Sequence, residues 1–136
     1  MPESSVPQPL PSLDPHQVRI LLVEDHEDSA RAFQILLRER GFVVQIATDV
    51  HSASRLARTG KFDVVLCDIR LPDGSGLDLM RGLHEEPRLS NLKGICISAL
   101  GMPDDIETSS QVGFSAHVTK PIDIHRLLGV IERVCG

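Results

Sequence analysis

Short apolar runs alternate with amphipathic segments along most of this chain. The stretch "VRILLVED" is almost continuously apolar and ends in two acids, whereas the following "HEDSARAFQILLRERG" repeats apolar residues at helical spacing. Continuous apolar runs are typical of strands buried on both faces, and a spacing of three and four residues is typical of a helix with one buried face. This alternation recurs five times and therefore predicts a doubly wound, parallel α/β sheet.

The same pattern predicts the position of each element. Strands are expected at 18–25, 42–49, 62–68, 92–100 and 116–120, and helices at 26–41, 49–60, 74–86, 103–113 and 123–136. Asp28 or Ser29 is the expected N-cap of the first helix, and Asp123 that of the last, because these side chains can accept from free helix amides. The residues expected on the buried face of the first helix are Ala30, Phe33, Leu36 and Leu37.

The first 17 residues differ in composition from the rest. Proline recurs among Ser and Gln in "MPESSVPQPLPSLDPHQ", a composition that cannot build a core. We therefore expect a tail or linker at 1–17 and one folded domain at 18–136, a size that suits a single core. A free-standing domain and a piece of a longer protein both remain open.

Charge and cysteine usage narrow the class of function. The formal net charge of −5 argues against direct DNA binding, which needs a surplus of Lys and Arg. Cys67, Cys96 and Cys135 have neither metal-type spacing nor an even number, which favours free thiols in a reducing cytoplasm. No apolar run approaches the ~18 residues that a membrane span requires, so we expect no membrane contact.

Polar residues stand where the predicted strands end. Ligands of open α/β sheets bind outside the carboxyl ends of the strands, so these residues should gather at one edge. Three carboxylates there would repel one another unless a cation such as Mg²⁺ offsets their charge, and a hydroxyl and an ammonium could contact a phosphoryl group. In that setting a carboxylate can act as a phosphoryl-accepting nucleophile. The strand-end residues are Glu24, Asp25, Asp68, Ser98, Ala99 and Lys120.

Four segments, "LLVEDHEDS", "VVLCDIRLPDGSG", "ICISAL" and "VTKPID", resemble the signature segments of the response-regulator receiver domain of two-component signalling. The resemblance implies a flavodoxin-like fold with five parallel strands in the order 2-1-3-4-5 and five helices. It implies a phosphoacceptor signalling domain and not an enzyme. The domain would take a phosphoryl group from a phosphohistidine of a histidine kinase or a histidine phosphotransfer protein and then switch a partner-binding face.

The resemblance also implies a role for each site residue. Asp68 would be the phosphoacceptor, and Mg²⁺ or Mn²⁺ would bind Asp25, Asp68 and the backbone carbonyl of Arg70, with Glu24 acting through water. The phosphoryl-binding residues would be Ser98, Ala99 and Lys120, and the Lys120–Pro121 peptide bond would be cis.

Two positions depart from the usual receiver pattern. His117 stands where the family has an aromatic switch residue, so it is either a polar switch or a half-exposed strand histidine with no such role. With this histidine, "GFSAHVTKPID" is closest to receivers of hybrid sensor histidine kinases. The side chain of Arg70 would either hinder attacking water or contact the phosphoryl group.

Three other functions fit this sequence less well. A haloacid-dehalogenase-like phosphatase needs a second acid two residues after the nucleophile, where this chain has Arg70. A flavin-phosphate binder needs a loop rich in hydroxyls and glycine, but the first loop reads "EDHED". A receiver that has lost phosphorylation would lack part of the acid, hydroxyl and lysine set. The output partner is unknown, and its expected binding surface is the helix around 104–111 with the last strand and the last helix.

Overall fold

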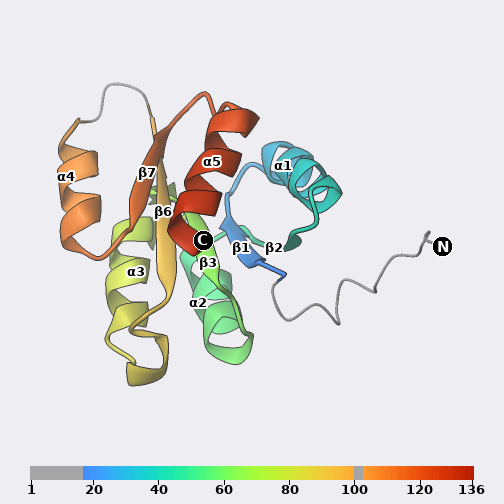
Figure 1. Cartoon of the computed structure of the whole chain (residues 1–136). Coiled ribbons are helices and arrows are strands. Elements are labelled where there is room, and N and C mark those ends of the chain that lie inside the picture. Colours follow the sequence, from blue (N-terminus) through green and yellow to red (C-terminus); the bar gives the residue numbers. More distant parts are fainter. Residues whose placement is uncertain (1–16, 100–102) are drawn as a thin grey trace.

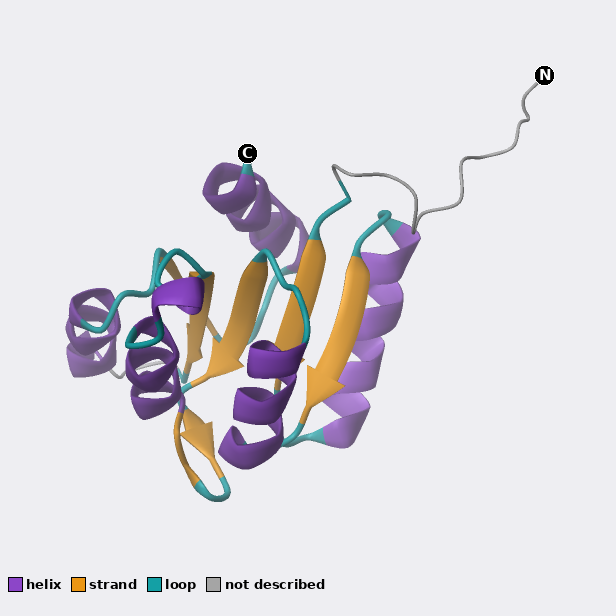
Figure 2. Cartoon of the chain, turned by 90° about the horizontal axis from the view of Figure 1, so that it is seen from below, coloured by secondary structure: helices purple, strands orange, loops and turns teal. Residues whose placement is uncertain are grey.

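Five parallel strands form the central sheet in the order β2-β1-β3-β6-β7 (Figures 1 and 2). The computed structural model describes residues 17–99 and 103–136 and, for 103–106, the backbone alone. The strands are β1 (Arg19–Val23), β2 (Val43–Ala47), β3 (Val64–Asp68), β6 (Lys93–Ser98) and β7 (Ala116–Thr119). Without the two short strands described below, this order is 2-1-3-4-5, which confirms the predicted fold. Of the predicted tail, only Gln17 falls within the described residues.

Helices cover both faces of the sheet. They are α1 (Glu27–Glu39), α2 (Val50–Thr59), α3 (Gly76–His84), α4 (Pro103–Gln111) and α5 (Ile124–Cys135). Helices α1 and α5 lie over one face, and α2 and α3 lie over the other (Figure 1).

Successive strand residues supply the two opposite cores. Ile20 packs in the core under α1 and α5, whereas Leu21 packs in the core under α2 and α3. All five residues of β3 are buried, as expected for the central strand of a sheet that is covered on both faces. This burial fixes the position of the residue at the carboxyl end of β3, which is Asp68.

The structure corrects the prediction for the first helix. Its N-cap is His26, which makes no side-chain capping bond, while Asp28 and Ser29 lie inside the helix. The acids of the first turn, Glu27 and Asp28, instead face the positive end of the helix dipole. Leu36 is 40% exposed, although it was expected in the core. Asp123, in contrast, is confirmed as the N-cap of α5, because it accepts from the amide of His125 at 2.9 Å.

Three short elements were not predicted. The segment after Asp68 forms an antiparallel hairpin of β4 (Arg70–Leu71) and β5 (Gly74–Ser75) before α3 begins at Gly76. A single 3-10 turn, η2 (Pro87–Leu89), follows α3. Such elements contain too few residues to show a hydrophobic period, so no pattern marks them in the sequence.

Candidate functional site

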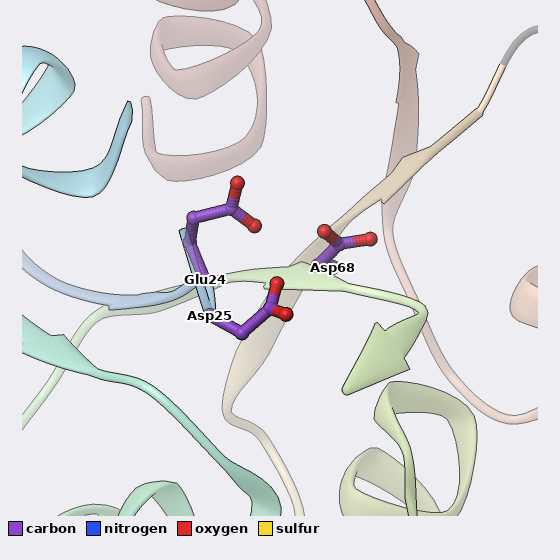
Figure 3. A group of neighbouring side chains, drawn as sticks. All are labelled: Glu24, Asp25 and Asp68. Atoms are coloured by element: carbon purple, nitrogen blue, oxygen red, sulfur yellow. The ribbon is translucent and has the colours of Figure 1, made fainter. Parts of the chain in front are cut away.

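Three carboxylates meet at the carboxyl edge of the sheet. Glu24 and Asp25 directly follow β1, and Asp68 is the last residue of the neighbouring strand β3. One oxygen from each of the three lies within 4.8 Å of the others, and the side chains point toward the same space (Figure 3). Glu24 and Asp68 are 9% and 7% exposed, whereas Asp25 is exposed. The two buried acids therefore form the floor of the site, and Asp25 forms its open side.

Backbone hydrogen bonds hold the two strand ends in place. The amide of Glu24 donates to the carbonyl of Ala47 at 3.0 Å, and the amide of Ile69 donates to the carbonyl of Ile97 at 3.1 Å. The amide of Gly76 folds back onto the carbonyl of Ile69 at 2.8 Å. A Cβ atom at Gly76 would lie 2.3 Å from the carbonyl oxygen of Asp68, so this close return requires glycine.

Lys120 joins the acidic cluster from the end of β7. Its Nζ atom donates to Oδ2 of Asp68 at 2.7 Å and lies 3.7 Å from Oε1 of Glu24. Burial lowers the pKa of Lys120, but its hydrogen bond to Asp68 and the surrounding negative charges outweigh that effect and raise the pKa overall. The ammonium therefore stays charged at neutral pH and offsets one of the three acids. The Lys120–Pro121 peptide bond is cis.

Glu24 is the most perturbed acid of this cluster. Burial, its hydrogen bond with Asp68 and the negative charges of Asp68 and Asp25 raise its pKa from 4.5 to about 7, although Lys120 opposes them. Its Oε2 atom is buried and has no hydrogen-bond partner among the described residues. A buried carboxylate oxygen without a partner is costly, and a divalent cation would supply the missing charge while a water bound to it would supply the missing contact. The residues therefore fit the Mg²⁺ site that the sequence predicts.

Ser98 and His117 contact each other on the far side of Asp68. Ser98 ends β6, is 2% exposed, and lies 2.5 Å through its Oγ atom from Nε2 of the half-buried His117. The amide of Lys120 donates to the carbonyl of Ser98 at 2.8 Å, so the serine and the lysine are linked through the backbone. Ala99 follows as an exposed residue. The two residues expected to contact a phosphoryl group thus come from adjacent, hydrogen-bonded strand ends.

The hairpin after Asp68 contains a residue that the sequence analysis missed. The carboxylate of Asp73 accepts from the amides of Val50 at 2.7 Å and His51 at 3.0 Å, which are the first two residues of α2. Asp73 therefore attaches the β4–β5 hairpin, which includes the exposed Arg70, to the start of α2. An acid is common in turns, but the sequence around Asp73 does not predict that its partners lie at the start of α2.

A pocket of about 250 Å³ lies beside the acidic cluster. Glu24 and Lys120 form its polar end, and Phe33 from α1 and Ile122 from the segment before α5 are among its apolar walls. His26 also lines it. The pocket therefore adjoins Glu24 and Lys120 between the start of α1 and the Lys120–Pro121 loop.

Comparison with known proteins settles the family. Residues 20–132 match the response regulator receiver domain family. The chain belongs to this family. Curated relatives include the polar-differentiation response regulator DivK of Brucella anthropi, which is 31% identical over 117 residues, covering 86% of this chain and 95% of the relative. The resemblance inferred from the four sequence segments is thereby confirmed.

Solved structures agree with this assignment. The receiver domain of HemR from Leptospira biflexa, in its non-phosphorylated form, has a TM-score of 0.80 and 29% identity, and the match covers 88% of this chain and 95% of that one. The receiver domain of a signal transduction histidine kinase from Syntrophus aciditrophicus has a TM-score of 0.79 and 26% identity, covering 87% of this chain and 89% of that one. Receiver domains of two-component signalling accept phosphoryl groups and work with histidine kinases or phosphotransfer proteins. Among the described residues, no helix is long and apolar enough to cross a bilayer.

Proposed function

We propose that this receiver domain accepts a phosphoryl group on Asp68 from the phosphohistidine of a histidine kinase or a histidine phosphotransfer protein. The observation that carries the proposal is the position of Asp68, which stands at the end of a fully buried strand and beside both an ammonium and two further acids. A carboxylate held in this way is a fixed nucleophile. In the transfer, a carboxylate oxygen of Asp68 forms the new bond to phosphorus as the phosphorus–nitrogen bond of the donor breaks and the imidazole leaves.

The surrounding residues supply the charge that the transfer needs. Lys120 reaches the Asp68 carboxylate at 2.7 Å and is in place to contact an oxygen of the incoming phosphoryl group. Ser98 supplies a hydroxyl from the neighbouring strand end. Asp25, Asp68 and the carbonyl of Arg70 would hold Mg²⁺ or Mn²⁺, with Glu24 acting through water. When bound, the cation would neutralise negative charge on the transferring group.

We further propose that phosphorylation alters a face formed by α4, β7 and α5. The support is the direct connection of this face to the site, because the amide of Lys120 bonds the carbonyl of Ser98 where β6 and β7 end. A ligand that binds two states unequally shifts their populations, and a phosphoryl group between Ser98 and Lys120 would act in this way. The output partner would read the changed face. Cys67, Cys96 and Cys135 form no disulfide with one another, which supports a cytoplasmic setting.

The decisive experiment is incubation of the protein with acetyl phosphate, with Mg²⁺ or with a chelator, followed by intact-mass measurement. We expect the wild type to gain the mass of one phosphoryl group only with Mg²⁺, and hydroxylamine to remove it, as it does an acyl phosphate. Asp68→Asn should gain none.

Asp78→Asn is the matched control. Asp78 is an exposed acid that pairs with Arg81 on the surface of α3, away from the acidic cluster. This variant should be phosphorylated as the wild type is. An unmodified wild type, or an equal adduct on Asp68→Asn, would refute the proposal.

A further inference from the structure

The hydroxyl of Ser98 has two candidate hydrogen-bond partners, the ring of His117 and a phosphoryl group on Asp68. It lies 2.5 Å from Nε2 of His117, and in the proposed function it must also contact a phosphoryl group on Asp68. A serine hydroxyl has one proton to donate and two lone pairs that accept. The direction of the bond with His117 therefore decides whether that proton is available to the phosphoryl group.

The sheet register produces this contact. His117 on β7 is the register partner of Cys96 on β6, and Ser98 lies two residues beyond Cys96 on the same face of the strand. Ser98 and His117 are therefore diagonal neighbours on adjacent parallel strands, and the imidazole reaches across to the serine hydroxyl. Ser98 is 2% exposed, so its hydroxyl depends on protein partners and not on bulk water.

Two arrangements of the pair differ in their effect on the site. If the hydroxyl donates to Nε2, its proton is not available to a phosphoryl group on Asp68. If Nε2 carries the hydrogen and donates to Oγ, the hydroxyl proton is left for an oxygen of the phosphoryl group. The second arrangement forms a continuous relay from His117 through Ser98 to the phosphoryl group, and hydrogen bonds to a charged acceptor are the stronger kind.

We propose that His117 is a positioning residue which donates from Nε2 to Ser98 when Asp68 carries a phosphoryl group, and so aims the Ser98 hydroxyl at it. The inference rests on the proposed function and deepens it. A neutral ring needs no net proton for this, because its one N–H can move from Nδ1 to Nε2 through solvent. His117 thus acts on the phosphoryl group by a hydrogen bond through Ser98, an effect that a carbon-only aromatic ring cannot supply.

The hydrogen position on His117 is measurable by NMR. Long-range ¹H–¹⁵N spectra distinguish a ring nitrogen that carries hydrogen from one that does not. With Mg²⁺ and beryllofluoride as the phosphoryl probe, we expect Nε2 of His117 to carry hydrogen, and we expect the resonance of this N–H to shift in the Ser98→Ala variant, which lacks its acceptor. A bare Nε2 in the beryllofluoride-bound wild type would overturn the inference.

A double-mutant cycle tests whether His117 works through Ser98. His117→Phe keeps a flat ring without nitrogen, and it should weaken beryllofluoride binding by about tenfold, because the Ser98 hydroxyl then loses the partner that aims it at the charged acceptor. His117→Gln retains a donor near the position of Nε2 and should recover most of this loss. In a Ser98→Ala background, His117→Phe should have no further effect.

Each outcome of the cycle has a separate meaning. If His117→Phe binds as tightly as the wild type, or loses tenfold even without Ser98, the positioning role is wrong while phosphorylation of Asp68 stands. If the wild type itself binds no beryllofluoride in Mg²⁺, both the proposed function and this inference fail. Asp68→Asn provides the baseline for no binding.

Discussion

The buried carboxyl group of Glu24 makes the stability of the folded protein depend on pH. It is 9% exposed, and burial together with its acidic neighbours raises its pKa to about 7. In the unfolded chain the same group would titrate near its ordinary value of 4.5. Between these two values the folded state binds more protons than the unfolded state, so stability falls as pH rises. The stability that the folded state gains by holding a proton on Glu24 is fully present below pH 4.5, and it is lost as the pH rises to about 7.

We therefore expect the free energy of unfolding of the metal-free protein to show a decline between pH 4.5 and about pH 7 that Glu24→Gln removes. The difference between the two proteins should change by on the order of 2 kcal/mol across this range. Chemical denaturation at each pH in the presence of a chelator measures it. Asp78→Asn, on an exposed surface, is the control that should follow the wild type. Parallel curves for Glu24→Gln and the wild type would contradict the expectation.

At the scale of elements, the β4–β5 hairpin is attached to α2 by one side chain. Asp73 accepts from the first two amides of α2, while Asp49, the local N-cap, accepts from Ser52 at 2.8 Å. A helix start with two acids satisfies amides that would otherwise lack partners and also faces the positive end of the dipole. The hairpin bearing Arg70 is thereby attached to the first turn of α2.

Removing this attachment should affect both stability and the site. We expect Asp73→Ala to lower the free energy of unfolding by about 1–2 kcal/mol, the usual effect of losing a helix cap. It should also weaken Mg²⁺ binding, because the carbonyl of Arg70 is a proposed ligand. Denaturation and calorimetric Mg²⁺ titration measure the two effects.

The control for this prediction is Asp123→Ala, which removes the cap of α5. That variant should lose similar stability, but its affinity for Mg²⁺ should be unchanged. Equal affinities of all three proteins for Mg²⁺ would show that the hairpin does not need Asp73 for its role at the site.

For the whole molecule, the order of strands and helices could be predicted because each main element is long enough to show its period. The fully apolar run from Val64 to Cys67 and the amphipathic helices predict a parallel sheet covered on both faces, while the spatial order of its strands was implied by the family resemblance. The two-residue strands β4 and β5 are too short for this. Leu36 was misplaced because α1 packs near the β2 edge of the sheet, which encloses Ala30 and Leu37 but leaves Leu36 exposed.

The site was predictable to the extent that it follows from strand ends. Glu24, Asp25, Asp68 and Lys120 were brought together because parallel strands bring their carboxyl ends to one edge. The contact between Ser98 and His117 depends on the register of two strands, and neither strand encodes that register alone.

The charge of the folded molecule leads to a last prediction. The chain carries a net charge of −5, and three of its acids lie within 4.8 Å of one another at the site, where the ammonium of Lys120 offsets part of their charge. Asp25→Asn removes one repelling charge and one proposed ligand. Without Mg²⁺ this variant should therefore melt at a higher temperature than the wild type. Saturating Mg²⁺ should stabilise the wild type by about 2–3 kcal/mol at a hundredfold excess over its Kd and leave Asp25→Asn almost unchanged. Thermal melts at matched ionic strength measure both effects.

The control is Asp28→Asn, which changes an acid in the first turn of α1 and should keep the Mg²⁺ response. If the acids only repel one another and bind no cation, Asp25→Asn will respond to Mg²⁺ as the wild type does. A higher melting temperature of Asp25→Asn without Mg²⁺, together with its loss of the Mg²⁺ response, therefore identifies a metal site.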